Sequence, residues 1–455
     1  MLGGEGVRER TSMIIPAVLA VFSFSYYMLV LTRHPLIYGV DGPYYLIQVR
    51  SLMQSGTLKY GDPPLSFVVF WLLSTVLGDV TLGVKVGTAL LTSLASIPAY
   101  LLLHRVTRSG VAAAAGALVY LLSPHYIRLM SDFIKNAVGC LFLLSFMYFL
   151  HRSLADGGAR NIIPSLFFLL LTGLTHILDL GLALLFLLLY PTVYAAIRGE
   201  FSRAVKVLFI HLGFLGTFAA AALTTFYHYF TDFFKGESFI EELIAGEGEI
   251  SPMSILSPMN SLVLPLLASG VILTAYLVGR RDEVSPLLLT SVLMGLALIM
   301  PFIPAKWLWR FAFMAFIPAS IIAASIVSKI GEDRAVALTL SALLVASTFL
   351  QAVPVVMRVG PTINMKDYQD LVRMGELMAP ESVVVVGDFG VKYWVEYVCD
   401  IPTAGHFTPE LWGQYDHVYV LLGLKPHVKL PPMPHKVVYE GERFMLVEIL
   451  PPPPP

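Results

Sequence analysis

The sequence predicts a mainly α-helical, polytopic membrane protein with a small external α/β domain at its C-terminus. Hydrophobic residues make up 56% of the 455 residues and charged residues only 13%, which is too apolar for a soluble globular protein. Apolar runs of about 18 or more residues recur from Met13 to Met357, as expected of membrane-spanning helices. We expect a transmembrane domain over residues 1–358 and a soluble domain over residues 359–455.

Eleven apolar segments are expected to cross the membrane. They are residues 13–32, 83–104, 110–129, 136–151, 161–176, 179–197, 204–227, 258–279, 285–304, 309–328 and 335–357. A further apolar segment, residues 63–78, would give a helix of about 24 Å, shorter than the ~30 Å hydrocarbon core. We expect this segment to dip into the membrane or lie obliquely rather than cross it.

Basic residues predict the orientation of the spans. If residues 63–78 do not cross, the connections that share a side with Arg8 and Arg10 hold most of the arginines and lysines. The positive-inside rule places that side in the cytoplasm, so we expect a multi-pass protein of the cell membrane with a cytoplasmic N-terminus. The segments expected outside the cell are 33–62, 130–135, 228–257, 305–308 and the whole C-terminal domain.

The residues beyond Gly360 show one helical pattern and several strand patterns. An amphipathic helix is expected over residues 366–378. Strands are expected at residues 382–387, 417–423, 436–440 and 443–450. The chain ends in five prolines, which cannot form a regular element. This pattern predicts a small α/β domain.

Charge and cysteine content exclude some classes of partner. The formal net charge is −1, and no basic patch dominates, which argues against a nucleic-acid partner. Cys140 lies in an apolar segment and Cys399 in the polar C-terminal region. The two cysteines therefore imply no disulfide framework, and no metal-ligand spacing is present.

The first external segment carries an acid at the start of an amphipathic run. Asp41 precedes Gly42 and Pro43, and residues 44–54 have the pattern of an interfacial helix. Two interpretations stay open. Asp41 is either a helix cap or a carboxylate at the floor of an active site at the membrane surface.

A second polar cluster lies in the segment SDFIKN. Asp132 and Lys135 are three residues apart and would share one face of the following helix. The acid offers the hard oxygen ligands that a divalent cation prefers, and the base suits an anion. Arg128, one turn earlier, would add charge towards a phosphate. The alternatives are an N-cap for Asp132 and an interfacial position for Arg128.

Two further clusters punctuate apolar segments. His176 and Asp179 stand between two spans, where a polar turn is the alternative interpretation. Lys306 and Arg310 lie among tryptophans, and aromatic and basic residues are common at any membrane interface. An arginine one turn inside an apolar helix is nonetheless expensive unless it meets an anion or water, and a lipid phosphate is a natural partner.

The long acidic connection 228–257 contains Glu247 and Glu249. Connections of this length without clear structure are often lids. A solvated acidic connector is the alternative, and the two glutamates are the acids best placed to reach back to a site.

Four stretches resemble the GT-C membrane glycosyltransferases, and most closely the catalytic subunit of oligosaccharyltransferase of the archaeal or bacterial type. GVDGPYYLIQVRSL is similar to that family's first external loop, which begins with an acid. SPHYIRLMSDFIKNAVG stands where the family has its second acidic motif. KWLWRFAFMAFIPAS resembles the arginine-bearing helix start that meets the lipid-linked donor, and GDFGVKYWVEYVCDIPTAGH takes the place of the WWDYG block.

The sequence departs from the family pattern at several places, and the connection 228–257 has no clear match to the family's glutamate motif. No second acid follows Asp132, although family members usually have two acids in that loop. Val386 and Gly387 stand where two tryptophans precede the aspartate of the WWDYG block. The family uses that block to recognise the acceptor, so the resemblance leaves protein, lipid and glycan acceptors open.

The resemblance implies transfer of a sugar or oligosaccharide from a polyprenyl (dolichyl) phosphate or diphosphate donor to an acceptor on the external face. The implied catalytic residues, which would also hold a divalent cation, Mn²⁺ or Mg²⁺, are Asp41 and Asp132. One of these two acids could instead be the base that activates the acceptor. The implied donor-phosphate-binding residues are Lys135, Arg128, Lys306 and Arg310. The implied acceptor-side residues are Asp388, Glu247, Glu249 and His176.

Two other functions remain open. A transporter or lipid flippase would place ionisable residues near the bilayer midplane and often shows internal repeats, whereas the acids and bases here cluster at one interface and no repeat is visible. A non-catalytic relative that keeps the fold is the other alternative, because the second acid is missing.

Overall fold

The computed structural model describes residues 3–231, 233–245, 257–331, 333–423 and 433–451. The chain divides into two compact units. The first unit comprises Met1–Val30, Tyr60–Ser66 and Val86–Arg358. The second comprises Leu31–Lys59, Phe67–Lys85 and Val359–Pro455. The boundary expected between residues 358 and 359 coincides with one of these divisions, but two segments expected in the transmembrane domain group with the C-terminal residues.

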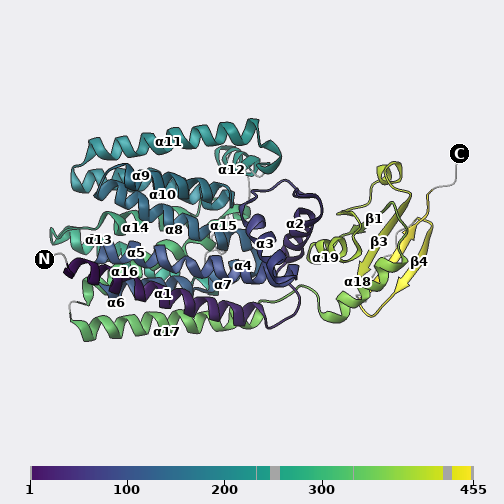
Figure 1. The fold of residues 1–455 in the computed structure, drawn as a ribbon, viewed down its shortest axis with the longest axis horizontal. Helices are drawn as coiled ribbons and strands as arrows, with labels where there is room; N and C mark the ends of the chain where they lie inside the picture. The colour runs from purple at the N-terminus through teal and green to yellow at the C-terminus, as the bar shows by residue number, and fades with distance from the viewer. Residues whose placement is uncertain (1–2, 232, 246–256, 332, 424–432, 452–455) are drawn as a thin grey trace. The chain divides into compact units, whose positions relative to one another are not determined.

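The first unit is a bundle of helices, which Figure 1 shows as long ribbons lying side by side. Its α-helices are α1 (Gly3–Leu31), α5 (Ser96–Thr107), α6 (Gly110–Leu121), α7 (Pro124–Asp132), α8 (Ile134–Ala155), α9 (Ala159–Gly173), α10 (Ile177–Arg198), α11 (Phe201–Thr224), α12 (Phe233–Ala245), α13 (Val263–Gly279), α14 (Pro286–Leu298), α15 (Ala305–Met314), α16 (Phe316–Ile330) and α17 (Arg334–Arg358). Two 3₁₀ turns, η1 (Tyr227–Tyr229) and η3 (Pro258–Ser261), flank α12 and the segment that follows it.

Among the described residues, eight helical segments are long and apolar enough to cross a membrane. They are Met13–Leu31, Val80–Thr107, Ile134–Ala155, Ile177–Arg198, Phe201–Thr224, Met259–Gly279, Ala305–Ile330 and Arg334–Arg358. A ninth span results if α6 and α7, which are bent by 42° at their junction, count together. The multi-pass helical architecture is therefore confirmed, with eight or nine spans by length rather than eleven.

The two remaining expected spans, residues 161–176 and 285–304, form helices that end before the last residue expected for each span. In α14 the helix stops at Leu298, and Pro301 and Pro304 follow; proline lacks the N–H that would continue the helix. In α9 the helix stops at Gly173, and His176 begins the next helix as its N-cap. Residues 63–78 form the short helix α3 (Leu65–Leu77), as expected of a segment too short to cross directly.

An aromatic core fixes the bent junction of α6 and α7. The rings of Tyr120 and Tyr126 lie 4.6 Å apart, and Phe316 of α16 contacts both. The Tyr126 hydroxyl donates to the carbonyl oxygens of Thr92, at 3.0 Å, and Ala137, at 3.2 Å. These buried hydrogen bonds tie α7 to the start of α8.

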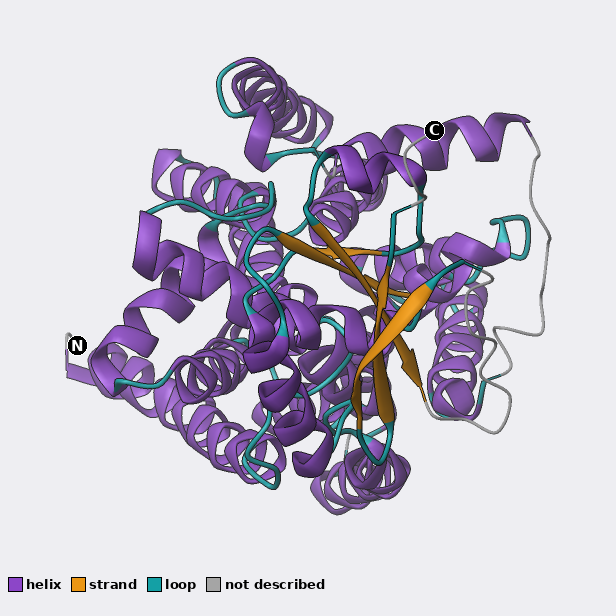
Figure 2. Cartoon of the chain, turned by 90° about the vertical axis from the view of Figure 1, so that its right-hand side faces the viewer, coloured by secondary structure: helices purple, strands orange, loops and turns teal. Residues whose placement is uncertain are grey.

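The second unit contains a five-stranded sheet, drawn in orange in Figure 2. Its strands are β1 (Ser382–Val386), β2 (Thr403–Ala404), β3 (His417–Gly423), β4 (His435–Glu440) and β5 (Phe444–Ile449). The strand order is β2-β1-β3-β5-β4. β1 pairs in parallel with β2 and β3, whereas β5 is antiparallel to β3 and β4. Every residue of β1 is buried, which explains its unbroken run of valines.

Helices complete the second unit and confirm the expected α/β architecture. The helix expected at residues 366–378 is α18 (Met365–Leu377), which begins with a capping box of Asn364 and Asp367. The unit also contains α2 (Gly42–Ser55), most of α3, the start of α4 (Val80–Leu94), α19 (Phe389–Cys399) and the 3₁₀ turn η4 (Pro409–Gly413). Helix α19 and strand β2 were not expected from the sequence.

Candidate active site

Asp132 and Lys135 lie on either side of the turn between α7 and α8. They therefore do not share one face of a single helix, which was the expectation from their spacing. Phe133 has non-helical backbone angles and separates the two helices. The Asp132 carboxylate accepts hydrogen bonds from Arg128 Nε and, at 3.1 Å, from Ser131 Oγ. The Asp132 side chain is 15% exposed. Asp132 therefore ends α7 rather than capping α8, and Arg128 neutralises its charge.

Lys135 forms a buried ion pair with a residue that the sequence analysis did not single out. Its Nζ donates to both carboxylate oxygens of Asp62, and the two side chains are 9% and 4% exposed. Asp62 precedes two prolines at the start of the short segment that leads into α3. That position, an acid directly before an apolar run, was the only sequence signal for it.

Helix α15 presents two cations in different settings. Lys306 Nζ lies 2.5 Å from Glu242 Oε1 of α12, and Trp307 Nε1 donates to Glu242 Oε2 at 2.8 Å. Hydrogen bonds from Lys306 and then Trp307 lower the pKa of the Glu242 carboxyl. The Arg310 guanidinium lies 5.6 Å and 5.3 Å from the ring centres of Trp307 and Trp309.

Arg310 is exposed and has no acidic partner among the residues that the structure describes. Trp309, on which it lies, contacts Phe133 of the α7–α8 turn with ring centres 5.6 Å apart. This contact links α15 to Asp132 and Lys135 within the first unit. An exposed guanidinium held by two aromatic rings beside a polar turn is suited to binding an anion.

His176 and Asp179 lie at the start of α10. His176 Nδ1 accepts from the Leu178 amide at 3.2 Å and lies 3.5 Å from Asp179 Oδ2. Asp179 is fully buried against Gly139 of α8, where a Cβ atom would collide with its carboxylate. His176 thus serves as a helix cap here, and its role on the acceptor side stays a prediction.

Asp41 and Asp388 belong to the second unit. The Asp41 carbonyl accepts from the Tyr45 amide at 3.3 Å, but its side chain makes no capping hydrogen bond. Its loop is held by the Gly39 amide, which donates to the Gly360 carbonyl at 3.0 Å. Asp388 is exposed and caps α19, accepting from the Gly390 amide at 2.9 Å. Both acids stay predictions as functional residues.

The described residues contain no cluster of three or more His, Cys, Asp or Glu side chains that could hold a metal ion. Asp132 offers the oxygen ligands that Mg²⁺ and Mn²⁺ prefer, but its carboxylate is already bound by Arg128. Asp41 lies in the other unit, so a metal site shared by the two acids stays a prediction. Glu247 and Glu249 lie outside the described residues.

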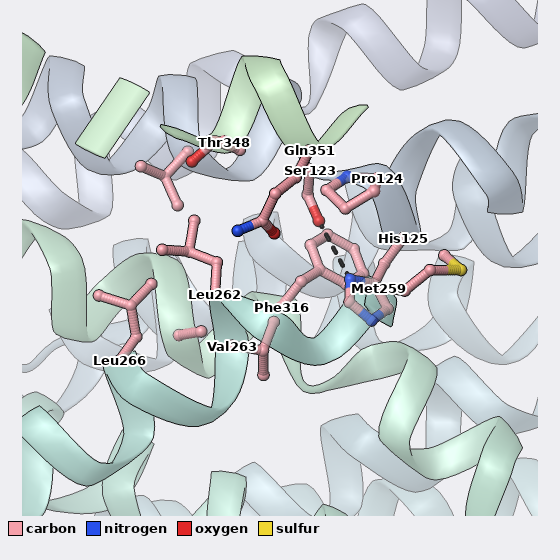
Figure 3. A pocket seen from close by; sticks show the side chains of 12 residues that line it. Ser123, Pro124, His125, Met259, Leu262, Val263, Leu266, Phe316, Thr348 and Gln351 are labelled. Atoms are coloured by element: carbon pink, nitrogen blue, oxygen red, sulfur yellow. Dashed lines mark hydrogen bonds between the residues drawn. The ribbon is translucent and has the colours of Figure 1, made fainter. Parts of the chain in front are cut away.

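A crevice in the bundle is separate from these charged residues. Figure 3 shows Ser123 and His125 joined by a hydrogen bond of 3.5 Å, with Gln351 and Phe316 nearby. Its lining is otherwise mainly aliphatic. His125 Nε2 forms a hydrogen bond of 2.6 Å with Asn260 Oδ1. None of the candidate acids and bases lines this crevice.

Comparisons with known proteins find similarity in structure rather than in sequence. No protein-family model matches the chain, and no curated protein matches it. The oligosaccharyltransferase of Archaeoglobus fulgidus, crystallised with Zn and sulfate, has a similar structure, with a TM-score of 0.59 and 14% identity over 86% of this chain. The present chain spans 62% of the length of that protein.

A second similar structure is ArnT from Cupriavidus metallidurans, solved with undecaprenyl phosphate bound. The TM-score is 0.60 with 14% identity, over 96% of this chain and 97% of that one. Both similarities show the fold. The GT-C-like fold expected from the sequence, a membrane helix bundle with a small C-terminal domain, is therefore confirmed.

Proposed function

We propose that the chain is a membrane glycosyltransferase that transfers a sugar or oligosaccharide from a polyprenyl phosphate or diphosphate to an acceptor on the external face. The observation that carries this proposal is Arg310, an exposed cation without an acidic partner among the described residues. It lies on Trp309, which contacts the turn carrying Asp132. The fold similarity supports the choice of a phosphate, because ArnT was solved with undecaprenyl phosphate.

In the proposed reaction the bond between the sugar carbon and the donor phosphate oxygen breaks while a bond to the acceptor forms. Negative charge develops on the leaving phosphate, and preorganised cations stabilise such charge most effectively where water is excluded. Arg310 binds the phosphate with its paired N–H groups. Lys306, Lys135 and Arg128 add positive charge, although each is shared with a carboxylate.

A carboxylate accepts the proton that the acceptor loses. Asp41 and Asp132 are the proposed bases, and the acid used must lie within hydrogen-bond reach of the acceptor. The same two acids offer oxygen ligands to Mn²⁺ or Mg²⁺, and such an ion, when bound, would neutralise charge on the phosphate. The proposed acceptor-side residues are Asp388, Glu247, Glu249 and His176.

Release of polyprenyl phosphate or diphosphate tests the proposal. Purified protein in nanodiscs is incubated with polyprenyl-linked sugars, with and without Mn²⁺ or Mg²⁺. We expect Arg310→Ala to slow release at least tenfold, because a lost charge-assisted hydrogen bond costs about 1.5–3 kcal/mol. If Asp132 is the base, Asp132→Asn should slow release more than Arg310→Ala does. If Asp41 is the base, Asp41→Asn should do so.

Arg280→Ala is the matched control. Arg280 is also exposed and lies over an aromatic ring, 5.1 Å from the centre of Tyr276, but it contacts none of the candidate residues that the structure describes. Equal loss in Arg280→Ala and Arg310→Ala would reject the phosphate site. Tight binding of the lipid-linked sugar with no release under any condition would instead favour a non-catalytic relative, which the pairing of Asp132 with Arg128 also fits.

A further inference from the structure

Helix α12 lies between two helices that are long enough to span a membrane. It follows α11 and the turn η1, and the chain later enters η3 and α13. Figure 1 draws α12 beside one end of α11. Its position in the chain therefore places α12 near a membrane surface, in a connection that the sequence analysis treated as an acidic lid or a solvated connector.

One side of α12 contacts the bundle. Phe239 contacts the rings of Trp307 and Phe311, with ring centres 5.5 Å and 5.0 Å apart. Three residues later on the same side, Glu242 binds Lys306 and Trp307. These contacts fix the rotation of the helix about its axis, because residues three apart lie on one face.

A second side of α12 is apolar and exposed. Ile240, Leu243 and Ile244 are 55%, 43% and 81% exposed, and their spacing of three and four residues places them on one stripe. Glu241 is exposed as well, and helical geometry turns it away from both the stripe and the bundle. The helix thus has one side toward protein, one apolar side and one polar side.

Exposed apolar residues also occur in neighbouring connections. Phe226 and Tyr227, directly after α11, are each 52% exposed, and Phe302, between α14 and α15, is 71% exposed. All three stand at the ends of helices that are apolar enough to lie in a membrane. Aromatic residues at such positions are typical of the boundary between lipid and water.

We propose that α12 is an interfacial helix whose stripe of Ile240, Leu243 and Ile244 is embedded in the lipid of the adjacent bilayer leaflet. The occupant is lipid because α12 stands in the chain between two helices that are long and apolar enough to span a membrane, and exposed apolar residues stand at the ends of such helices. The polar side, with Glu241, faces water. A helix with separate apolar and polar sides lies in the plane of the membrane boundary in this way.

In this proposal, α12 contacts both the lipid leaflet and helix α15. Lipid holds the outer side of α12 while Glu242 and Phe239 hold its inner side against Lys306, Trp307 and Phe311. The position of α12 is therefore set by both the membrane and the bundle. The inference does not depend on the proposed function.

Spin labels on three cysteine variants test the proposal. Ile240→Cys, Ile244→Cys and Glu241→Cys are made in full-length protein that also carries Cys399→Ser; Cys140 is fully buried and needs no change. The labelled proteins are placed in phosphatidylcholine nanodiscs. Collision of each label with oxygen, which concentrates in lipid, is compared with collision with a water-soluble nickel chelate.

Two labelled positions calibrate the scale. Phe209→Cys lies in the span α11, where Phe209 is 68% exposed, and Lys366→Cys lies in the C-terminal domain, where the lysine side chain is 76% exposed. We expect the oxygen-to-nickel ratio at positions 240 and 244 to exceed that at 241 several-fold and to fall near that at 209.

Two outcomes would overturn the proposal. Nickel collision at 240 and 244 as frequent as at 366 would place the stripe in water. Immobile labels at 240 and 244 that neither reagent reaches would mean that protein covers the stripe. Because three positions sample one helix, a failed label at one of them does not prevent the comparison.

Discussion

Lys135 and Asp62 lose their hydration together when the bundle forms, since their side chains are only 9% and 4% exposed. The attraction between such charges roughly offsets the loss of hydration, so the pair adds little net stability. Removing one partner is different, because the other charge stays buried without compensation. Asp62 therefore fixes the position and the charge of Lys135 beside the α7–α8 turn.

We expect Asp62→Asn to lower the free energy of unfolding by about 3 kcal/mol. The double variant Asp62→Leu with Lys135→Met should recover most of this loss, because no charge remains buried. Denaturant titration in detergent micelles measures both. Glu442→Gln is the control: it breaks an ion pair with Lys366 whose side chains are 76% and 78% exposed and should cost under about 1 kcal/mol.

A cost of Asp62→Asn no larger than that of Glu442→Gln would show that another group compensates the charge of Lys135.

The same ion pair shows which contacts residue patterns can predict. Spacing singled out Asp132 and Lys135, which lie on either side of one turn in the structure. It did not identify Asp62, which is 73 positions from Lys135 in the sequence and meets it only through the fold. The cap formed by His176 and the pairing of Arg128 with Asp132 are local, but neither was among the interpretations drawn from the sequence.

Among the elements, apolar segments were predicted well and their ends less well. Hydrophobic composition identified every long span, because a membrane requires about 20 apolar residues in a helix. It overestimated α9 and α14, since apolar residues continue past the points where Gly173 and Leu298 end these helices. Hydrophobic composition also did not predict α19 or the two-residue strand β2. The formation of β2 depends on its pairing with β1.

Helix α12 gives a pH-dependent prediction. Lys306 and Trp307 lower the pKa of Glu242 below the ordinary carboxyl value of 4.5. A depressed pKa means that the contact stabilises the folded state above 4.5 and that this contribution is lost as the pH falls through the lower, folded-state value. We expect the contact between α12 and α15 to be intact at neutral pH and to loosen in acid.

The mobility of a spin label at position 244 measures this loosening. It should rise as the pH falls below 4.5, while Glu242→Gln should show one mobility across the whole range, because its amide does not titrate. High salt should weaken the contact at neutral pH, since Lys306 is 64% exposed. The same acid transition in Glu242→Gln would assign the pH dependence to another group.

At the scale of the whole molecule, the division of the chain differs from a simple N-terminal and C-terminal split. Residues 31–59 and 67–85 group with the C-terminal domain, although composition placed them with the membrane bundle. The reason lies in tertiary contacts. Arg50 of α2 donates to the Tyr397 carbonyl at 2.8 Å and to Asp400 at 2.9 Å, and no local pattern predicts such a partner.

The same unit contains a buried carboxylate with a cation partner. Glu396 of α19 is fully buried, lies 2.8 Å from Lys59 Nζ and accepts from the Thr403 hydroxyl at 3.1 Å. Together with Arg50 these contacts join α2 to α19. The segment that carries Asp41 is therefore expected to open and close with the C-terminal domain as one cooperative unit.

Amide hydrogen exchange in the full-length protein tests this cooperation. Arg50→Ala removes charge-assisted hydrogen bonds worth about 1.5 kcal/mol, so exchange in α2 and α19 should rise about tenfold together. Arg373→Ala is the control in the same unit, because Arg373 is 67% exposed and lies 3.9 Å from Asp370 within α18. Faster exchange in α19 with α2 unchanged would show that the first external segment is held independently of the C-terminal domain, and Asp41 would then be positioned by its own loop.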